Sequence, residues 1–108
     1  MSVDQTDVVD AIGVDEVSGK VVLTISDHLE WSENEHLLQL QEKVNTYLSF
    51  IESGELLSSY PDASGREVLI NVVCKYPPDD RGVGFLRQVA SVVDGAGIEF
   101  GYHVFGAN

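Results

Sequence analysis

Apolar and polar residues alternate along four short segments of this chain, as they do in β-strands that have one buried face. Residues 8–14 and 20–26 predict two strands, and the turn-forming residues 15–19 between them predict a hairpin. Residues 67–76 predict the strongest strand, and residues 98–104 predict the last one. In the second strand one face is apolar and the other is mixed, so the sheet is expected to be covered on one side.

A long amphipathic helix is predicted between the second and third strands. Its apolar residues recur at three- and four-residue steps and form one stripe, which comprises Leu37, Leu40, Val44, Tyr47, Leu48 and Ile51. Ser32 is expected to be the N-cap, because Glu35 follows at the capping-box spacing and Glu33 adds a second acid to the first turn. Gly54 has the character of a C′ residue, and residues 55–65 predict a loop.

A second helix is expected from Asp79 or Asp80 to about Asp94, before Gly95 and Gly97. The order ββαβαβ predicts an α+β fold: a two-layer sandwich in which two helices cover one face of a four-stranded mixed sheet. We expect a single domain over residues 1–108, with residues 1–6 as a flexible tail. The predicted core comprises Leu23, Ile25, Leu40, Val44, Leu48, Ile51, Val68, Ile70, Val72, Leu86, Val89, Val93, Phe100 and Tyr102.

The charge of the chain is strongly acidic and unevenly distributed. Residues 1–62 hold 13 acids against two lysines, a net of −11, whereas residues 63–108 have a net of −1. Such a charge repels phosphate backbones, so nucleic acid is not expected as a partner, although a basic protein would be attracted. No apolar run has the roughly 20 residues that span a bilayer, and a single cysteine fits a reducing compartment, so a cytoplasmic protein without membrane partners is expected.

Four segments resemble a known family. The runs VVDAIGVD, VVLTISDHLEW, YLSFIESGEL and VCKYPP, and above all SDHLEW followed by LLQLQEKVNTYLSFIESG, are similar to the DUF6572 family of small bacterial domains. The resemblance covers nearly the whole chain and implies a soluble bacterial domain of unknown function. The family has no established activity, so it supplies no catalytic, cofactor or metal residues.

The candidate chemistry is sparse. Asp27, His28, Glu35 and His36 gather around the predicted strand-to-helix turn, and His103 lies near the end of the last strand. Imidazoles and carboxylates can bind zinc, but no HxxxH or HxH spacing is present, so no metal or cofactor is assigned. Cys74 alternates in phase with the apolar residues of its strand and is expected to be buried. Nucleophile, phosphate-loop and dinucleotide motifs are lacking, so no catalytic residue is assigned and enzyme activity is disfavoured.

Trp31 has two interpretations. It can pack inward before the helix as a hydrophobic staple, with Leu37 as the expected contact. It can also be an exposed aromatic residue within an acidic surface that binds a basic protein. The candidate partner-binding residues on the second interpretation are Asp27, Glu30, Trp31, Glu33 and Glu35.

The uncovered face of the sheet is not purely polar. Val22, Leu69, Val73 and Phe105 interrupt its polar residues, and an apolar patch of this kind favours a homodimer. The sequence therefore predicts a non-enzymatic protein-interaction module. Two alternatives stay open: an immunity or antitoxin-like inhibitor of a basic toxin, and a small-molecule or metal-binding protein.

Overall fold

The structure is a computed structural model that describes residues 9–32 and 35–105. Its sheet contains β1 (Ala11–Val14), β2 (Val21–Asp27), β3 (Val68–Cys74) and β4 (Glu99–Val104), in the spatial order β1-β2-β3-β4. β1 is antiparallel to β2, whereas β2, β3 and β4 are parallel to one another. The sheet is therefore mixed, as the sequence predicted, and each strand lies beside the one that precedes it in the chain.

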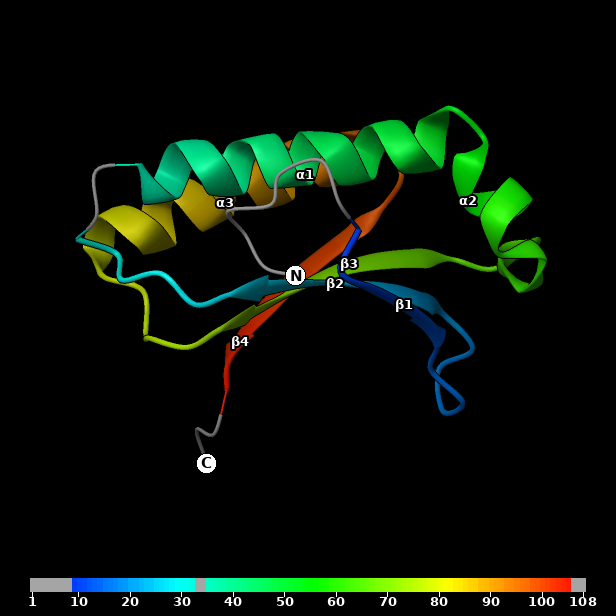
Figure 1. The fold of residues 1–108 in the computed structure, drawn as a ribbon, viewed down its shortest axis with the longest axis horizontal. Coiled ribbons are helices and arrows are strands. Elements are labelled where there is room, and N and C mark those ends of the chain that lie inside the picture. The colour runs from blue at the N-terminus through cyan, green and yellow to red at the C-terminus, as the bar shows by residue number, and fades with distance from the viewer. Residues whose placement is uncertain (1–8, 33–34, 106–108) are drawn as a thin grey trace.

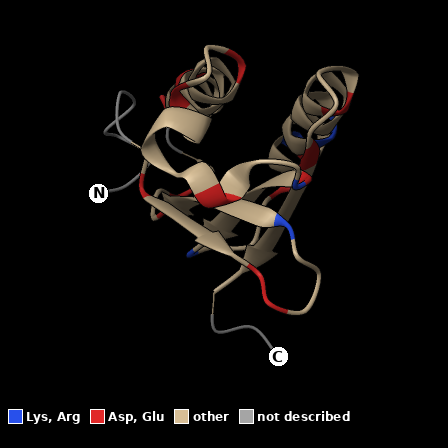
Figure 2. Ribbon diagram, turned by 90° about the vertical axis from the view of Figure 1, so that its right-hand side faces the viewer, with Lys and Arg blue, Asp and Glu red and all other residues tan. Residues whose placement is uncertain are grey.

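Helices α1 (His36–Glu52) and α3 (Asp80–Gly95) connect the parallel strands and pack on the same face of the sheet (Figure 1). The connections from β2 to β3 and from β3 to β4 run in the same direction across the sheet. Because both crossovers have the same hand, their helices lie on the same side. The opposite face of the sheet is covered by no element that the structure describes (Figure 2). None of the helices within the described residues is long and apolar enough to cross a membrane.

Local sequence signals explain several element boundaries. Asp15 closes the β1–β2 hairpin, because its carboxylate accepts hydrogen bonds from the Val17 amide and the Ser18 hydroxyl. Asp79 caps α3, since its Oδ1 accepts the Gly82 amide at 2.7 Å. Gly54 follows α1 with a φ of 89°, a left-handed conformation that favours glycine. These boundaries agree with the sequence predictions.

Two predictions of local structure are wrong. The long helix begins at His36 rather than after Ser32, and Glu35 precedes it without a side-chain cap. The helix begins later because the segment after β2 first places the buried Trp31 ring against His36. The predicted loop 55–65 contains the short helix α2 (Glu55–Ser59) and the 3-10 turn η1 (Pro61–Ala63), because Leu56 and Ala63 turn into the core. The strand predicted from residue 8 is β1, which begins at Ala11; residue 8 lies outside the described residues.

The core lies between the two helices and the sheet, and most of its predicted residues are buried there. Ile51, Val68 and Phe100 are half-buried, which is a weaker form of the prediction. The prediction that Tyr102 is buried is wrong, because this residue is 41% exposed although it lies in register with buried Val72. β4 is an edge strand with a neighbour on one side only, so the face of a residue does not by itself ensure burial.

Truncation of a helix residue in this core tests the packing. Leu48 is buried on the side of α1 that faces the sheet. Leu48→Ala should lower the free energy of unfolding by about 2–5 kcal/mol, because it removes transfer energy and leaves a cavity. Chemical denaturation measures this loss. The matched variant Leu38→Ala, at an exposed position of the same helix, should change stability by less than about 0.5 kcal/mol. Equal losses in the two variants would contradict the assigned packing of α1.

Candidate functional site

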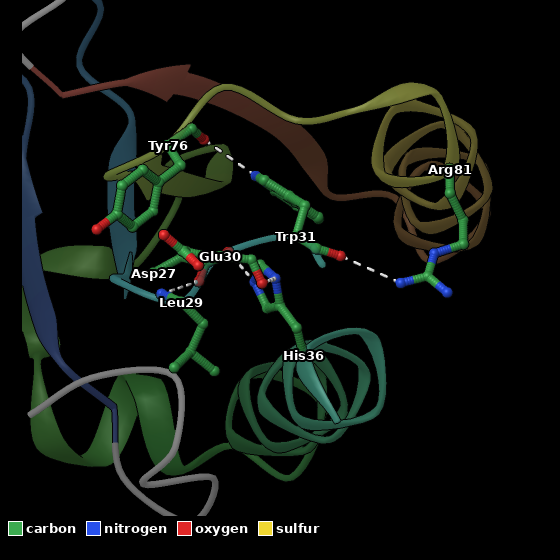
Figure 3. Close-up of polar contacts among 7 residues, drawn as sticks. All are labelled: Asp27, Leu29, Glu30, Trp31, His36, Tyr76 and Arg81. Atoms are coloured by element: carbon green, nitrogen blue, oxygen red, sulfur yellow. Dashed lines mark hydrogen bonds and ion pairs between the residues drawn. The ribbon is translucent and has the colours of Figure 1, made fainter. Parts of the chain in front are cut away.

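A buried ion pair joins the end of β2 to the start of α1 (Figure 3). Asp27 is the last residue of β2, and His36 is the first residue of α1. Nε2 of His36 lies 2.6 Å from Oδ2 of Asp27, and both side chains are sealed from solvent. Such a short contact between a ring nitrogen and a carboxylate oxygen is strong and directional, so it fixes where the helix begins relative to the strand.

The partners of His36 determine where its protons lie. Nδ1 lies 3.2 Å from the backbone carbonyl of Glu30, and a carbonyl can only accept, so Nδ1 carries a hydrogen. One further proton lies between Nε2 and Asp27, either on an imidazolium that faces a carboxylate or on a carboxylic acid that faces a neutral ring. The other Asp27 oxygen, Oδ1, accepts the Leu29 amide at 3.2 Å. Every polar atom of the pair is therefore hydrogen-bonded.

Trp31 connects this pair to β3 and α3. Its ring packs against His36 with centroids 4.2 Å apart, and its Nε1 donates to the Tyr76 carbonyl at 3.0 Å (Figure 3). Its own carbonyl accepts from the Arg81 guanidinium at 3.1 Å. The ring also lies against the first turn of α3, where a Cβ added to Gly82 would come within 2.6 Å of Trp31 Cε3. Trp31 thus holds the carboxyl end of β3 and the start of both helices together.

Of the candidate partner-binding residues that the structure describes, two are buried and two are exposed. Trp31 is only 4% exposed and Asp27 is fully buried, so neither side chain is available on the surface. The interpretation of Trp31 as an exposed aromatic contact is therefore wrong, because its ring fills the space beside His36 and Gly82. Glu30 and Glu35 are exposed, and Glu33 lies outside the described residues. Binding of a basic partner by the exposed acids stays a prediction.

Cys74 is buried, as its alternation predicted. Burial raises the pKa of its thiol from 9.0 to about 12, and the nearby Asp27 carboxylate acts in the same direction. The thiol therefore keeps its proton at neutral pH. A thiolate is the nucleophilic form of cysteine, so this environment suits a core residue and opposes covalent catalysis.

The remaining histidines lie on the surface at the same end of the sheet. His28 follows β2, and His103 lies in β4; both are exposed. His36 is directed inward toward Asp27, so the three imidazoles are divided between the core and the surface. Within residues 9–32 and 35–105, no group of three or more His, Cys, Asp or Glu side chains is arranged to hold a metal ion.

Sequence reasoning missed a second buried polar cluster. Lys43 of α1 is fully buried, and its Nζ donates to Asp10 Oδ1 at 2.8 Å. Asp10 Oδ2 accepts the Ser26 amide at 3.0 Å, and the Asp10 amide donates to the Tyr47 hydroxyl at 2.7 Å. Tyr47 in turn donates to the Thr24 carbonyl, and burial raises the pKa of its phenol. The cluster joins the chain before β1 to both β2 and α1.

A signal for this cluster is present in the sequence. Lys43 lies three residues after Leu40 and four before Tyr47, on the apolar stripe of the helix. A lysine on a buried stripe requires a carboxylate partner, because an isolated buried charge is too costly. The acidic N-terminal region supplies Asp10 for this purpose.

One face of the sheet is left uncovered by the elements that the structure describes. Side chains that alternate with the buried ones lie on it, namely Val22, Thr24, Ser26, Leu69, Asn71, Val73, Glu99, Gly101 and His103. Val22, Leu69 and Val73 are half-buried, and Phe105, which follows β4, is 74% exposed. We call this surface the open face. It contains the four residues that the sequence assigned to a dimer interface.

The contact between Trp31 and Gly82 gives a test of the buried site. Gly82→Ala should destabilise the fold by about 1–3 kcal/mol, because the new methyl group would overlap the Trp31 ring. Gly84→Ala is the matched control: it lies in the same helix with open space around it and should be neutral or stabilising by up to about 1 kcal/mol. Thermal or chemical denaturation measures both. A neutral Gly82→Ala variant would show that Trp31 does not pack there.

The protonated thiol gives a second test. Native protein at pH 7.5 should react very slowly with a maleimide, whereas protein unfolded in guanidinium should react completely within minutes. The unfolded thiol ionises near its ordinary pKa of 9.0 and the folded thiol only near 12, so this group lowers stability as pH rises from about 9 to 12. Rapid labelling of the native thiol at pH 7.5 would contradict its burial.

Comparison with known proteins agrees with the resemblance in the sequence. Neither the curated proteins nor the solved structures contain a match to this chain. A family model does match, and it covers residues 1–106. The chain therefore belongs to the DUF6572 family, a family of unknown function.

Proposed function

We propose that this protein is a non-enzymatic interaction module that forms a homodimer through the open face of its sheet. The observation that carries this proposal is the row of apolar side chains on that face. Val22, Leu69 and Val73 come from adjacent strands, and exposed Phe105 adds an aromatic ring beside Val73. Apolar side chains that gather on one exposed face are characteristic of interaction surfaces, and two-fold pairing is the commonest way to cover them.

The distribution of charge supports the same surface. The chain has a net charge of −12, so two copies repel each other unless they meet through a region of low charge. Among the strand residues of the open face, only Glu99 is an acid, and its carboxylate is paired with Lys20 at 2.6 Å. Acidic residues lie instead along the helices and in the β1–β2 hairpin (Figure 2). The centre of the open face therefore carries no charge that pairing would leave unpartnered.

The size of the face sets the expected strength of pairing. Three strands about 20 Å long and the shorter β1, about 13 Å long, lie about 4.8 Å apart and form a surface of at most roughly 20 Å by 20 Å. Two such faces together amount to roughly 800 Å², which is below the about 1,200–2,000 Å² of stable specific complexes and fits a weak, transient interface. Self-association in the micromolar range is therefore expected, and it should be measured over a range of protein concentrations.

The buried groups support an interaction role rather than catalysis. The strongest acid-base pair, Asp27 and His36, is sealed from solvent, and every polar atom of the pair already has a partner. The thiol of Cys74 is also sealed, and its pKa is raised by burial. These groups are best explained by their contribution to the fold.

A charge placed on the open face tests the proposal. Sedimentation equilibrium should give a concentration-dependent dimer for the wild type and a monomer for Val73→Glu, because the carboxylate would be desolvated among apolar residues. Val92→Glu is the matched control, since it adds the same charge at a residue of α3 that is 64% exposed on the other side of the molecule. It should leave the dimer intact. A wild-type protein that stays monomeric up to several hundred micromolar would refute the proposal.

A further inference from the structure

The open-face residues of β3 and its flanks form a sequence that is complementary to itself. In order they are an acid, an aliphatic residue, an amide, an aliphatic residue and a base: Glu67, Leu69, Asn71, Val73 and Lys75. If this row is turned by 180° about Asn71 and laid on itself, acid meets base, aliphatic meets aliphatic and amide meets amide. Isologous interfaces require this property, because residue i must contact residue j while j contacts i.

The structure supports the placement of both ends of this row. Lys75 lines a shallow hollow together with Val73 and Phe105 and with Ser26, Asp27 and His28 at the end of β2. At the other end, the Lys20 ammonium binds Glu99 and reaches from β2 across to β4. Glu67 lies beside Lys20 as well, because the amide of the next residue, Val21, donates to the Glu67 carbonyl at 2.9 Å. The acid and the base of the row therefore lie at opposite ends of the same face.

The neighbouring strand β4 repeats the pattern about the same line, whereas β2 does not, because Lys20 and His28 flank its open-face residues. Asn71 lies in register with Thr24 of β2 and Gly101 of β4, and Thr24 lies opposite Ala11 of β1. These side chains are small or uncharged, so two sheets can approach closely along this row. In β4, Glu99 and His103 lie two residues to either side of Gly101, again an acid opposed to a group that can be cationic.

We propose that the dimer partner is a second copy of this chain laid antiparallel on the open face, with the two-fold axis over the Ala11–Thr24–Asn71–Gly101 row. The proposal rests on the proposed function and defines its geometry. Each copy then brings Glu67 to Lys75 of the other copy and Leu69 to its Val73. The contact between Glu67 and Lys75 occurs twice by symmetry and favours this orientation over one that sets Glu67 against Glu67.

A face-to-face arrangement with its two-fold axis along β3 is disfavoured by charge. With the axis parallel to the strands, each end of the face would meet the same end of the other copy. If that axis lies over β3, Glu67 meets Glu67 and Lys75 meets Lys75. In the antiparallel arrangement, the strands of the two packed sheets cross at about 30°. Glu67 and Lys75 each lie four residues, or about 13 Å, from the axis. The resulting offset is small enough for the long Glu and Lys side chains to span.

Single and mixed charge reversals test the arrangement. Glu67→Lys and Lys75→Glu should each raise the dimer dissociation constant by about tenfold or more, because two attractive contacts become repulsive in each homodimer. When the two variants are mixed, the heterodimer should form preferentially, since each of its two contacts pairs an acid with a base. Native mass spectrometry, with one variant labelled with ¹⁵N, distinguishes the heterodimer from both homodimers. Glu52→Lys at the end of α1 changes the net charge as Glu67→Lys does and should leave the dissociation constant unchanged.

The outcomes separate the arrangement from the dimer itself. Preferential heterodimers, together with two weakened homodimers, support the antiparallel arrangement. A dimer that Glu67→Lys strengthens, or a mixture in which the heterodimer has only its statistical share, overturns the arrangement while the dimer stands. A monomeric wild type overturns the proposed function and this arrangement with it. Circular dichroism of each variant before mixing ensures that only folded proteins are compared.

Discussion

The sealed contact between Asp27 and His36 is the constraint on which the rest of the fold depends. It joins the end of β2 to the first residue of α1, and the chain between them carries Trp31 to the carboxyl end of β3 and the first turn of α3. Buried ion pairs add little net stability, because the cost of desolvation offsets their attraction, but they strongly penalise any packing that separates the partners. The pair therefore acts mainly on geometry. It fixes the start of α1 against the end of β2, while the two crossovers of one hand keep both helices on the same side of the sheet.

The fold could be predicted from the sequence because its core follows simple periodicities. Alternation in β2 and β3 and the three- to four-residue steps of α1 and α3 identified the layers and most of the core. The prediction that Tyr102 is buried failed because alternation gives the face on which a residue lies, but not how far the neighbouring helix extends over an edge strand. The prediction of Ser32 as the N-cap failed because the capping-box pattern is local, whereas the start of α1 is set by contacts of His36 with residues several positions earlier.

The candidate sites were predicted less well, since they depend on which ionisable groups are internal. Asp10 and Asp27 contribute to the acidic charge of the first half of the chain, yet both have internal partners, Lys43 and His36. A tally of acids along the sequence therefore overstates what a basic partner would meet on the surface. The open face, by contrast, was predictable at the level of its residues, because the same alternation that places one set of side chains in the core places the other set outside.

Asp10 blocks a position at which another β-strand could add to this sheet. β1 pairs with β2 only from Val21 to Thr24, so the amide of Ser26 extends past the end of the neighbouring strand. An unpaired amide at a sheet margin is a template onto which a foreign strand can add, and sheets left unprotected in this way join edge to edge. The Asp10 carboxylate occupies that amide while its other oxygen is held by Lys43. A strand that sought to extend the sheet here would first have to displace a buried, doubly bound carboxylate, which discourages open-ended growth into fibres at this margin.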